Sequence, residues 1–197
     1  DDVLAEQAAS PTQAADVRSQ LQLLLGDAGT TISTDATVML YAPTWRDDAR
    51  GTTQRTDAHL EGLRDHLDGD WKGLARLHYF TQGAGLGDGG PFLIDVSGYP
   101  DAAPLYLAAD VLVTDYSSVM FDFAITGKPM VFFAHDIDHY EGTLRGFYLD
   151  YRASMPGPIV DDVPTLARAL QRSAGDRSEF AGRYEQFRRE FCHLEDG

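Results

Sequence analysis

The sequence predicts an α/β fold in which a doubly wound parallel sheet is covered by helices, and three observations lead to it. Short runs of apolar and β-branched residues recur along the chain and alternate with stretches in which apolar residues have helical spacing. The runs are unbroken, which is typical of strands buried on both faces of a sheet. No repeat or Pro/Gly/Ser-rich linker divides the 197 residues, so we expect one such domain.

The chain begins with a segment that we expect to be a helical edge or a linker. This segment, residues 1–36, contains one predicted helix from about Ala14 to Leu25, because Gly26 follows it as a stop signal. Position 1 is not a methionine and the chain ends abruptly, so we expect a piece of a longer protein. The first buried strand is predicted at 37–43 (TVMLYAP), where Pro43 closes it.

Helices and strands then alternate along the rest of the chain. Leu60, Leu63 and Leu67 have helical spacing after a candidate N-cap at Thr56 or Asp57. Further strands are predicted at 73–80, 91–97, 111–115 and 129–134, and further helices at 101–110, 117–127, 162–174 and 176–192.

Composition excludes several classes of protein. The formal charge of −15, from 31 acidic and 16 basic residues, argues against nucleic acid as a partner. Hydrophobic residues at 43% suffice for a sizeable core, and no apolar run approaches the ~20 residues of a membrane span. The single cysteine, Cys192, rules out an intrachain disulfide and fits a reducing compartment.

Polar side chains follow most of the predicted strands, at the edge of the sheet where ligands of parallel α/β folds bind. Packing of the core does not require Ser, Thr, His, Asp or Arg at these positions. The residues are Thr44, Trp45, Arg46, His78, Asp95, Ser97, Thr114, Asp115, Ser117, Ser118, His135 and Asp136.

The strand that ends at Asp115 leads directly into a helix through two serines. Ser117 or Ser118 should occupy the N-cap or first helical position, beside backbone N–H groups that the helix leaves unpaired. A helix N-terminus of this kind suits a phosphate group. A plain serine N-cap without a ligand also explains the junction, but the Asp-Tyr-Ser-Ser cluster among other polar strand ends favours a binding site.

Two arginines and a histidine are further candidates, each with a structural alternative. Arg145 and Arg46 could bind phosphate oxygens through both guanidinium edges, or could be solvated loop residues. His78, at the end of a predicted strand, could donate to phosphate or transfer a proton, or could be a structural histidine.

We expect neither a metal nor another cofactor. The histidines in AHDIDHYEG have no metal-site spacing that we can justify, and Asp136-Ile137-Asp138 only imitates the Asp-x-Asp of metal-dependent glycosyltransferases. The stretch GLGDGG (85–90) leads through a proline into a strand, so it lacks the helix of a dinucleotide-binding loop. TGKP (126–129) lacks the preceding glycine and following Ser or Thr of a phosphate-binding loop.

Five stretches carry a resemblance to a known family: YAPTWR (41–46), RLHY (76–79), IDVSGYPDAAPLYLAADVLVTDYSSVMFDFAITGKPMVFF (94–133), DIDHYEGTLRGFYLDY (136–151) and PGPIV (156–160). Together they resemble the CDP-glycerol glycerophosphotransferases, bacterial enzymes that prime or polymerise teichoic acid. The resemblance covers roughly residues 37–197 and is strongest in D-Y-S-S-V-x-F-D-F, followed by K-P and R-G-F-Y.

The resemblance implies the nucleotide-binding, C-terminal half of a two-domain GT-B transferase, with residues 37–197 as the CDP-polyol domain and the N-terminal acceptor domain absent from this chain. It implies catalytic roles for His78 and Asp122. Asp122 is unusual as a carboxylate one turn into an apolar helix, on the same face as Ser118. The implied CDP-glycerol contacts are Thr44, Arg46, Asp95, Asp115, Ser117, Ser118 and Arg145.

The implied reaction is phosphoryl transfer. An acceptor hydroxyl on a lipid-linked polyol-phosphate chain attacks the glycerol-bearing phosphorus and CMP leaves, with a histidine of the absent half expected as base. The resemblance places the enzyme in the cytoplasm, peripheral on the inner face of the cell membrane. CDP-ribitol as donor, a nucleotide-sugar glycosyltransferase of GT-B type and a non-catalytic binding domain remain alternatives.

Overall fold

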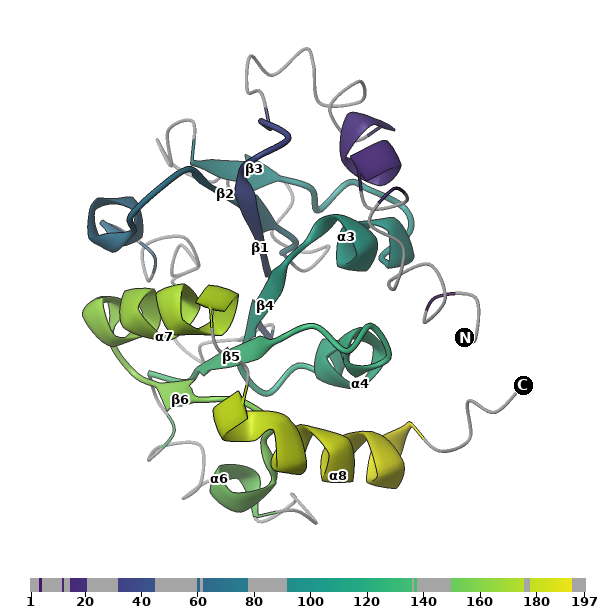
Figure 1. Ribbon diagram of the computed structural model, residues 1–197, viewed down its shortest axis with the longest axis vertical. Helices are drawn as coiled ribbons and strands as arrows, with labels where there is room; N and C mark the ends of the chain where they lie inside the picture. The colour runs from purple at the N-terminus through teal and green to yellow at the C-terminus, as the bar shows by residue number, and fades with distance from the viewer. Residues whose placement is uncertain are drawn as a thin grey trace, which may run out of the picture.

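The computed structural model describes residues 4, 12, 15–20, 32–44, 60, 62–77, 92–135, 137, 150–175 and 178–192. Within them, six strands form one sheet in the order β3-β2-β1-β4-β5-β6, and every neighbouring pair is parallel (Figure 1). This is the order of a doubly wound sheet, so the predicted fold class is confirmed. The strands are β1 (Thr37–Tyr41), β2 (Trp71–Ala75), β3 (Leu93–Asp95), β4 (Val111–Thr114), β5 (Met130–Phe133) and β6 (Ile159–Val160).

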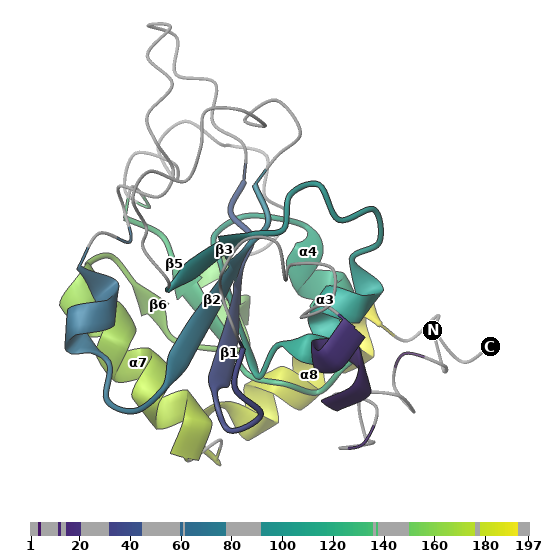
Figure 2. The ribbon, with the colours of Figure 1, turned by 90° about the horizontal axis from the view of Figure 1, so that it is seen from above.

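Helices cover both faces of the sheet. Figure 2 shows α7 and the short 3-10 helix η3 on one face, and α3, α4 and α8 on the other. The helical elements are η3 (Leu63–His66), α3 (Ala103–Ala108), α4 (Val119–Ala124), α6 (Tyr151–Ser154), α7 (Val163–Gly175), η5 (Ser178–Phe180) and α8 (Ala181–Phe191).

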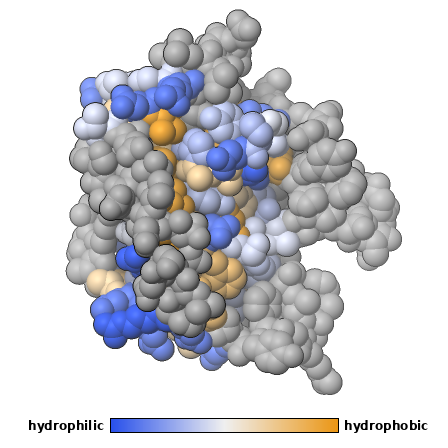
Figure 3. Space-filling model, turned by 90° about the vertical axis from the view of Figure 1, so that its right-hand side faces the viewer, coloured by the Kyte–Doolittle hydropathy of each residue, from blue (hydrophilic) through white to orange (hydrophobic). Residues whose placement is uncertain are grey.

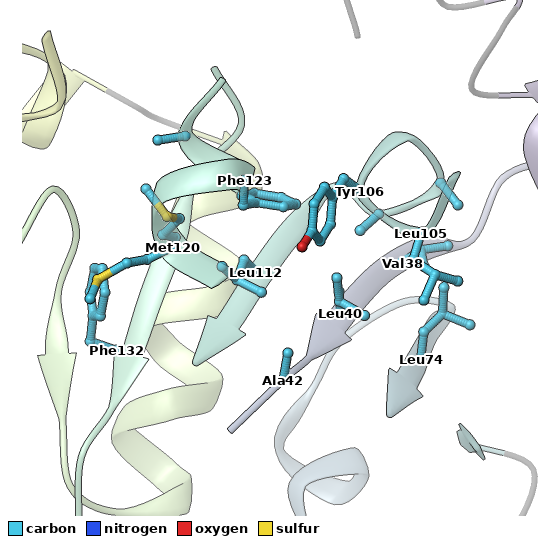
Figure 4. Close-up of a cluster of buried hydrophobic side chains, with 14 of the residues drawn as sticks. Val38, Leu40, Ala42, Leu74, Leu105, Tyr106, Leu112, Met120, Phe123 and Phe132 are labelled. Atoms are coloured by element: carbon cyan, nitrogen blue, oxygen red, sulfur yellow. The ribbon is translucent and has the colours of Figure 1, made fainter. Parts of the chain in front are cut away.

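Strand β1 divides the core because its side chains alternate between the two faces of the sheet. Val38 and Leu40 point into the cluster under α3, α4 and α8, where Phe123 is fully buried (Figure 4). Met39 and Tyr41 point into the cluster under η3 and α7. Both faces of β1 are therefore buried, as its unbroken apolar sequence predicts.

The predicted limits of two early elements are wrong. The second strand was expected at 73–80, but β2 starts at Trp71, whose ring is buried and whose indole N–H donates to the Asp68 carbonyl oxygen. It ends at Ala75, three residues before His78. The helix expected to run through Leu67 is, in the described residues, only the 3-10 turn η3, because Gly62 before it has a left-handed φ of 75°.

Two elements near the end of the sheet were not expected. Strand β6 has only two residues, and it follows a Pro-Gly-Pro stretch that hides it from a search for apolar runs. Gly157 in that stretch is required, because a Cβ there would lie 2.0 Å from the Met130 carbonyl oxygen. The four-residue helix α6 is capped by Asp150, whose carboxylate accepts from the Ala153 N–H at 3.1 Å.

The described surface mixes polar and apolar residues. Figure 3, which shows the right-hand side of Figure 1, has hydrophilic residues with small groups of apolar ones between them. In the ranges given above, no helix has both the length and the apolar character needed to cross a membrane.

Candidate functional site

The sheet reverses its strand order between β1 and β4, and we call the space beyond the carboxyl ends of these two strands the crevice. Strands β2 and β3 lie on one side of β1, and strands β5 and β6 lie on the other side, beyond β4. The connections that leave β1 and β4 therefore cross to opposite faces, and ligands of open α/β sheets bind between them. Thr44 lies beyond the end of β1, and Asp115 directly follows β4, so both predicted residues border the crevice.

A carboxylate joins the two loops across this crevice. The Thr44 backbone N–H and the Thr44 hydroxyl both donate to Oδ1 of Asp115, each at 2.7 Å. Asp115 is 2% exposed, so its carboxyl group is largely shielded from water, whereas Thr44 is partly exposed. Deeper in the sheet, the Thr114 hydroxyl donates to the Ala42 carbonyl oxygen at 2.7 Å. The loops after β1 and β4 are thus held together by side chains beyond the strand ladder.

Helix α6 also contacts the loop after β4. The Tyr151 hydroxyl donates to the Asp115 carbonyl oxygen at 2.7 Å, and the Tyr151 ring lies 5.2 Å from that of Tyr116. The sequence analysis did not single out Tyr151. The stretch YLDY could have indicated a short helix capped by Asp150, but not the hydrogen bond of the Tyr151 hydroxyl.

The two serines lie at the start of α4, as predicted, but the helix is short. Ser118 is the exposed N-cap residue, and its side chain makes no capping hydrogen bond. The Ser117 hydroxyl is 3.5 Å from the Val119 N–H, which is a weak contact at best. Regular helix ends at Ala124, six residues in, and the chain tightens through Ile125 to Gly127 (φ 67°), although helix was predicted to 127.

The loops after β2 and β3 form the outer side of the carboxyl edge. The Arg76 guanidinium donates to the Tyr99 carbonyl oxygen at 2.9 Å, and the Leu77 N–H donates to the Ser97 hydroxyl at 2.9 Å. Asp95, a predicted substrate contact, accepts from the Ser97 N–H at 2.8 Å and so shapes its own turn. Arg76 was missed because the strand was expected to end later, which placed His78 rather than Arg76 at its edge.

Asp122 lies on α4 with much of its surface exposed, and the partial burial of its carboxyl group raises its pKa above the ordinary value of 3.8. Tyr106 of α3 lies close enough to respond to this charge. Burial raises the pKa of the Tyr106 hydroxyl to about 12, and the negative charge of Asp122 adds to the increase. A carboxyl group with raised proton affinity can serve in proton transfer, and the catalytic role of Asp122 stays a prediction.

The raised pKa of Asp122 predicts a dependence of stability on pH. The native state binds the Asp122 proton more tightly than the unfolded chain does, so this group favours folding at acid pH and loses that contribution as pH rises through its pKa. Asp122→Asn should therefore be slightly more stable than the parent chain at pH about 7, within the ~0.5 kcal/mol usual for surface changes. Urea unfolding at pH about 7 and about 3.5 measures this gain, which should shrink at the lower pH. An equal difference at both values would contradict the assignment.

The remaining predicted contacts cannot be placed. Arg46, His78 and Arg145 lie outside the described residues and stay predictions. The described residues contain no group of three or more His, Cys, Asp or Glu that could hold a metal ion, and the acidic and histidine-containing stretch 136–139 is described only at Ile137.

A separate cavity of about 590 Å³ lies at the opposite edge of the sheet, near the amino ends of β5 and β6. Its lining includes Met130, Gly157, Phe180, Tyr184 and Arg188. It shares none of the predicted contacts at the carboxyl edge, so we treat the crevice between β1 and β4 as the candidate site.

Known proteins are similar to this chain in both sequence and architecture. A family model for CDP-glycerol:poly(glycerophosphate) glycerophosphotransferase matches residues 12–197. A teichoic acid glycerol-phosphate transferase of Staphylococcus aureus (strain NCTC 8325 / PS 47) is 44% identical over 170 residues, which are 84% of this chain and 43% of that protein.

Solved structures of a wall teichoic acid polymerase, TagF, have the same fold. One superposes with a TM-score of 0.81 at 37% identity, over 98% of this chain and 45% of that one. A histidine-to-asparagine variant of TagF soaked with CDPG superposes with a TM-score of 0.78 at 36% identity, over 97% of this chain and 44% of that one. The chain thus spans less than half the length of these relatives.

Proposed function

Because the chain belongs to the CDP-glycerol:poly(glycerophosphate) glycerophosphotransferase family, we propose that it is the donor-binding domain of an enzyme that transfers glycerol phosphate from CDP-glycerol during teichoic acid synthesis. The observation that supports this most directly is the match to TagF soaked with CDPG, which extends over 97% of the chain. The expected alternative donors are CDP-ribitol and a nucleotide sugar.

The crevice between β1 and β4 is the proposed place of the nucleotide. Its polar residues come from loops that the sheet brings together, and the exposed Ser118 hydroxyl is not used to cap α4. A six-residue helix has only a small dipole, so most of the diphosphate charge must be balanced by side chains. We propose that Arg46 and Arg145 balance the negative charge of the diphosphate and that Ser117 and Ser118 donate hydrogen bonds to it.

The proposed reaction is an in-line displacement at the phosphorus atom attached to glycerol. The acceptor hydroxyl oxygen forms a bond to this phosphorus, the bond to the bridging oxygen breaks, and CMP leaves with that oxygen. A base takes the hydroxyl proton. Catalysis of this kind depends on positioning and on stabilising charge at the phosphate oxygens. His78 and Asp122 are the proposed participants from this chain.

The acceptor and the place of action are also proposals. The relatives are named for teichoic acid transferases and polymerases, so the proposed acceptor is a lipid-linked polyol phosphate. This chain covers 43% of the S. aureus protein, and we assign acceptor binding to the part of such proteins that it does not match. The site of action would be the inner face of the cell membrane.

Calorimetric titration of the 197-residue chain with CDP-glycerol, CDP-ribitol, CMP, UMP and UDP-glucose tests the proposed function. We expect CDP-glycerol to bind most tightly and UDP-glucose to bind least. A pocket that hydrogen-bonds the cytosine amine should prefer CMP over UMP by about 1–3 kcal/mol, because the wrong base leaves buried groups unpaired. Absence of binding to all of these nucleotides would refute the proposal. Tighter binding of CDP-ribitol than of CDP-glycerol would identify CDP-ribitol as the donor.

The same titration with EDTA tests the expectation that no metal is needed. Arginines and serines can balance the diphosphate charge, so CDP-glycerol affinity should be unchanged within about threefold on chelation. A loss of orders of magnitude would instead identify Asp136 and Asp138 as candidate metal ligands.

A further inference from the structure

Asp115 occupies an unusual position for a residue expected to bind a nucleotide diphosphate. It is 2% exposed, and Oδ1 already accepts two hydrogen bonds from Thr44 at 2.7 Å. Burying a carboxyl group is costly unless hydrogen bonds compensate it, so the contacts with Thr44 offset part of the cost of burying this side chain. An anionic side chain would also repel phosphate oxygens rather than bind them.

The backbone of Asp115 is fixed as well as its side chain. Its carbonyl oxygen accepts the hydroxyl proton of Tyr151 at 2.7 Å. Asp115 therefore connects three segments that are distant in sequence: the loop after β1, the loop after β4 and helix α6. We call this set of contacts among Thr44, Asp115 and Tyr151 the crevice bracket.

We propose that Asp115 is a positioning residue for the nucleotide, acting through Thr44 rather than by direct contact. The proposal rests on the proposed function. The bracket holds Thr44, beyond the end of β1, against Asp115, which lies three residues before Ser118. Ser117 and Ser118 are proposed phosphate contacts, and Thr44 precedes the proposed contact Arg46 by two positions in the sequence, so holding Thr44 and Asp115 together prepares the site before the ligand arrives.

The bracket predicts different effects for two substitutions of Asp115. In Asp115→Asn, the amide oxygen can still accept from the Thr44 N–H and hydroxyl, whereas Asp115→Ala removes the acceptor. We expect Asp115→Ala to weaken CDP-glycerol binding by at least about tenfold and Asp115→Asn by about threefold or less. Thr44→Val, which keeps the N–H but not the hydroxyl, should lie between them.

Coupling between Thr44 and Asp115 is the second readout. If Asp115 works through Thr44, the double variant Thr44→Val/Asp115→Ala should bind CDP-glycerol no more weakly than Asp115→Ala alone. Additive losses would mean that the two residues act on the ligand independently and would overturn the proposal. So would an Asp115→Asn loss as large as that of Asp115→Ala, since a direct ionic role would then explain both.

A measurement without ligand separates this inference from the proposed function. Hydrogen exchange at the Thr44 amide, followed by NMR, should be slow in the parent chain and equally slow in Asp115→Asn. In Asp115→Ala it should be faster by about tenfold or more. Unprotected exchange in the parent chain would show that the bracket is absent. Protected exchange in a chain that binds no CDP-glycerol would instead refute the proposed function, and with it any nucleotide for the bracket to position.

Asp110 offers a matched control at the other end of the same two strands. Its Oδ2 accepts from the Val38 N–H at 2.8 Å and pairs with the Arg18 guanidinium at 2.7 Å, at the amino edge of the sheet. Asp110→Ala should lower the melting temperature but leave both CDP-glycerol affinity and Thr44 exchange at the level of the parent chain. Loss of affinity in this control would mean that general destabilisation, not the bracket, explains the Asp115 variants.

Discussion

Replacement of Phe123 by alanine is expected to lower the free energy of unfolding by about 3–5 kcal/mol, as is usual when a fully buried aromatic ring is removed. The Phe123 side chain has no exposed surface and meets the Tyr106 ring edge-on, with centroids 5.8 Å apart (Figure 4). These two rings join α4 to α3 over the sheet. Urea unfolding at neutral pH gives the difference directly.

Phe121 on the same helix provides the control. Its ring is half-buried and stacks on Phe187 of α8, with centroids 5.5 Å apart. Phe121→Ala should cost about half as much as Phe123→Ala, because less apolar surface returns to water. Equal losses for the two variants would show that the cluster under α3 and α4 is not the tighter part of the core.

The central strands could be predicted because burial on both faces leaves a clear sequence pattern. In β1, β4 and β5 nearly every side chain is buried, and each was predicted to within about two residues at either end. Strand β6 escaped prediction because two residues show no periodicity, and its place depends on pairing with β5. The order of the strands is a property of distant pairings that local patterns do not contain.

Some features of the candidate site could likewise be predicted from the sequence and others could not. Thr44, Asp115, Ser117 and Ser118 could be named because polar residues at the ends of apolar strands are conspicuous, and the structure brings Thr44 and Asp115 into contact. Their hydrogen bonds to each other could not be predicted, since 71 residues separate them. Tyr151 was missed because its hydroxyl acts through a backbone carbonyl, for which no sequence motif exists.

Lys128 has a structural role that its place in the family motif does not reveal. Its ammonium group donates to the carbonyl oxygens of Tyr106, Leu107 and Ala109 at 3.0, 2.7 and 2.7 Å. These are carbonyls at the C-terminal end of α3, which have no partners within the helix and have a partial negative charge. The turn after α4 is thus fastened to the end of α3, at the amino edge of the sheet and away from the crevice.

Lys128→Met should therefore lower the free energy of unfolding by about 2–3 kcal/mol, the range expected when hydrogen bonds to a charged group are lost and their buried acceptors remain. Methionine keeps most of the apolar stem, so the change isolates the ammonium group. Lys128→Arg should recover only part of the loss, because a planar guanidinium cannot direct three donors at three converging carbonyls.

Thermal and urea unfolding measure stability, and CDP-glycerol titration well below the melting temperature should show affinity close to that of the parent chain. A stability change of less than about 0.5 kcal/mol, the level of an ordinary surface substitution, would refute the capping role. A loss of nucleotide affinity without a loss of stability would show that Lys128 acts in nucleotide binding and not in stabilising the fold.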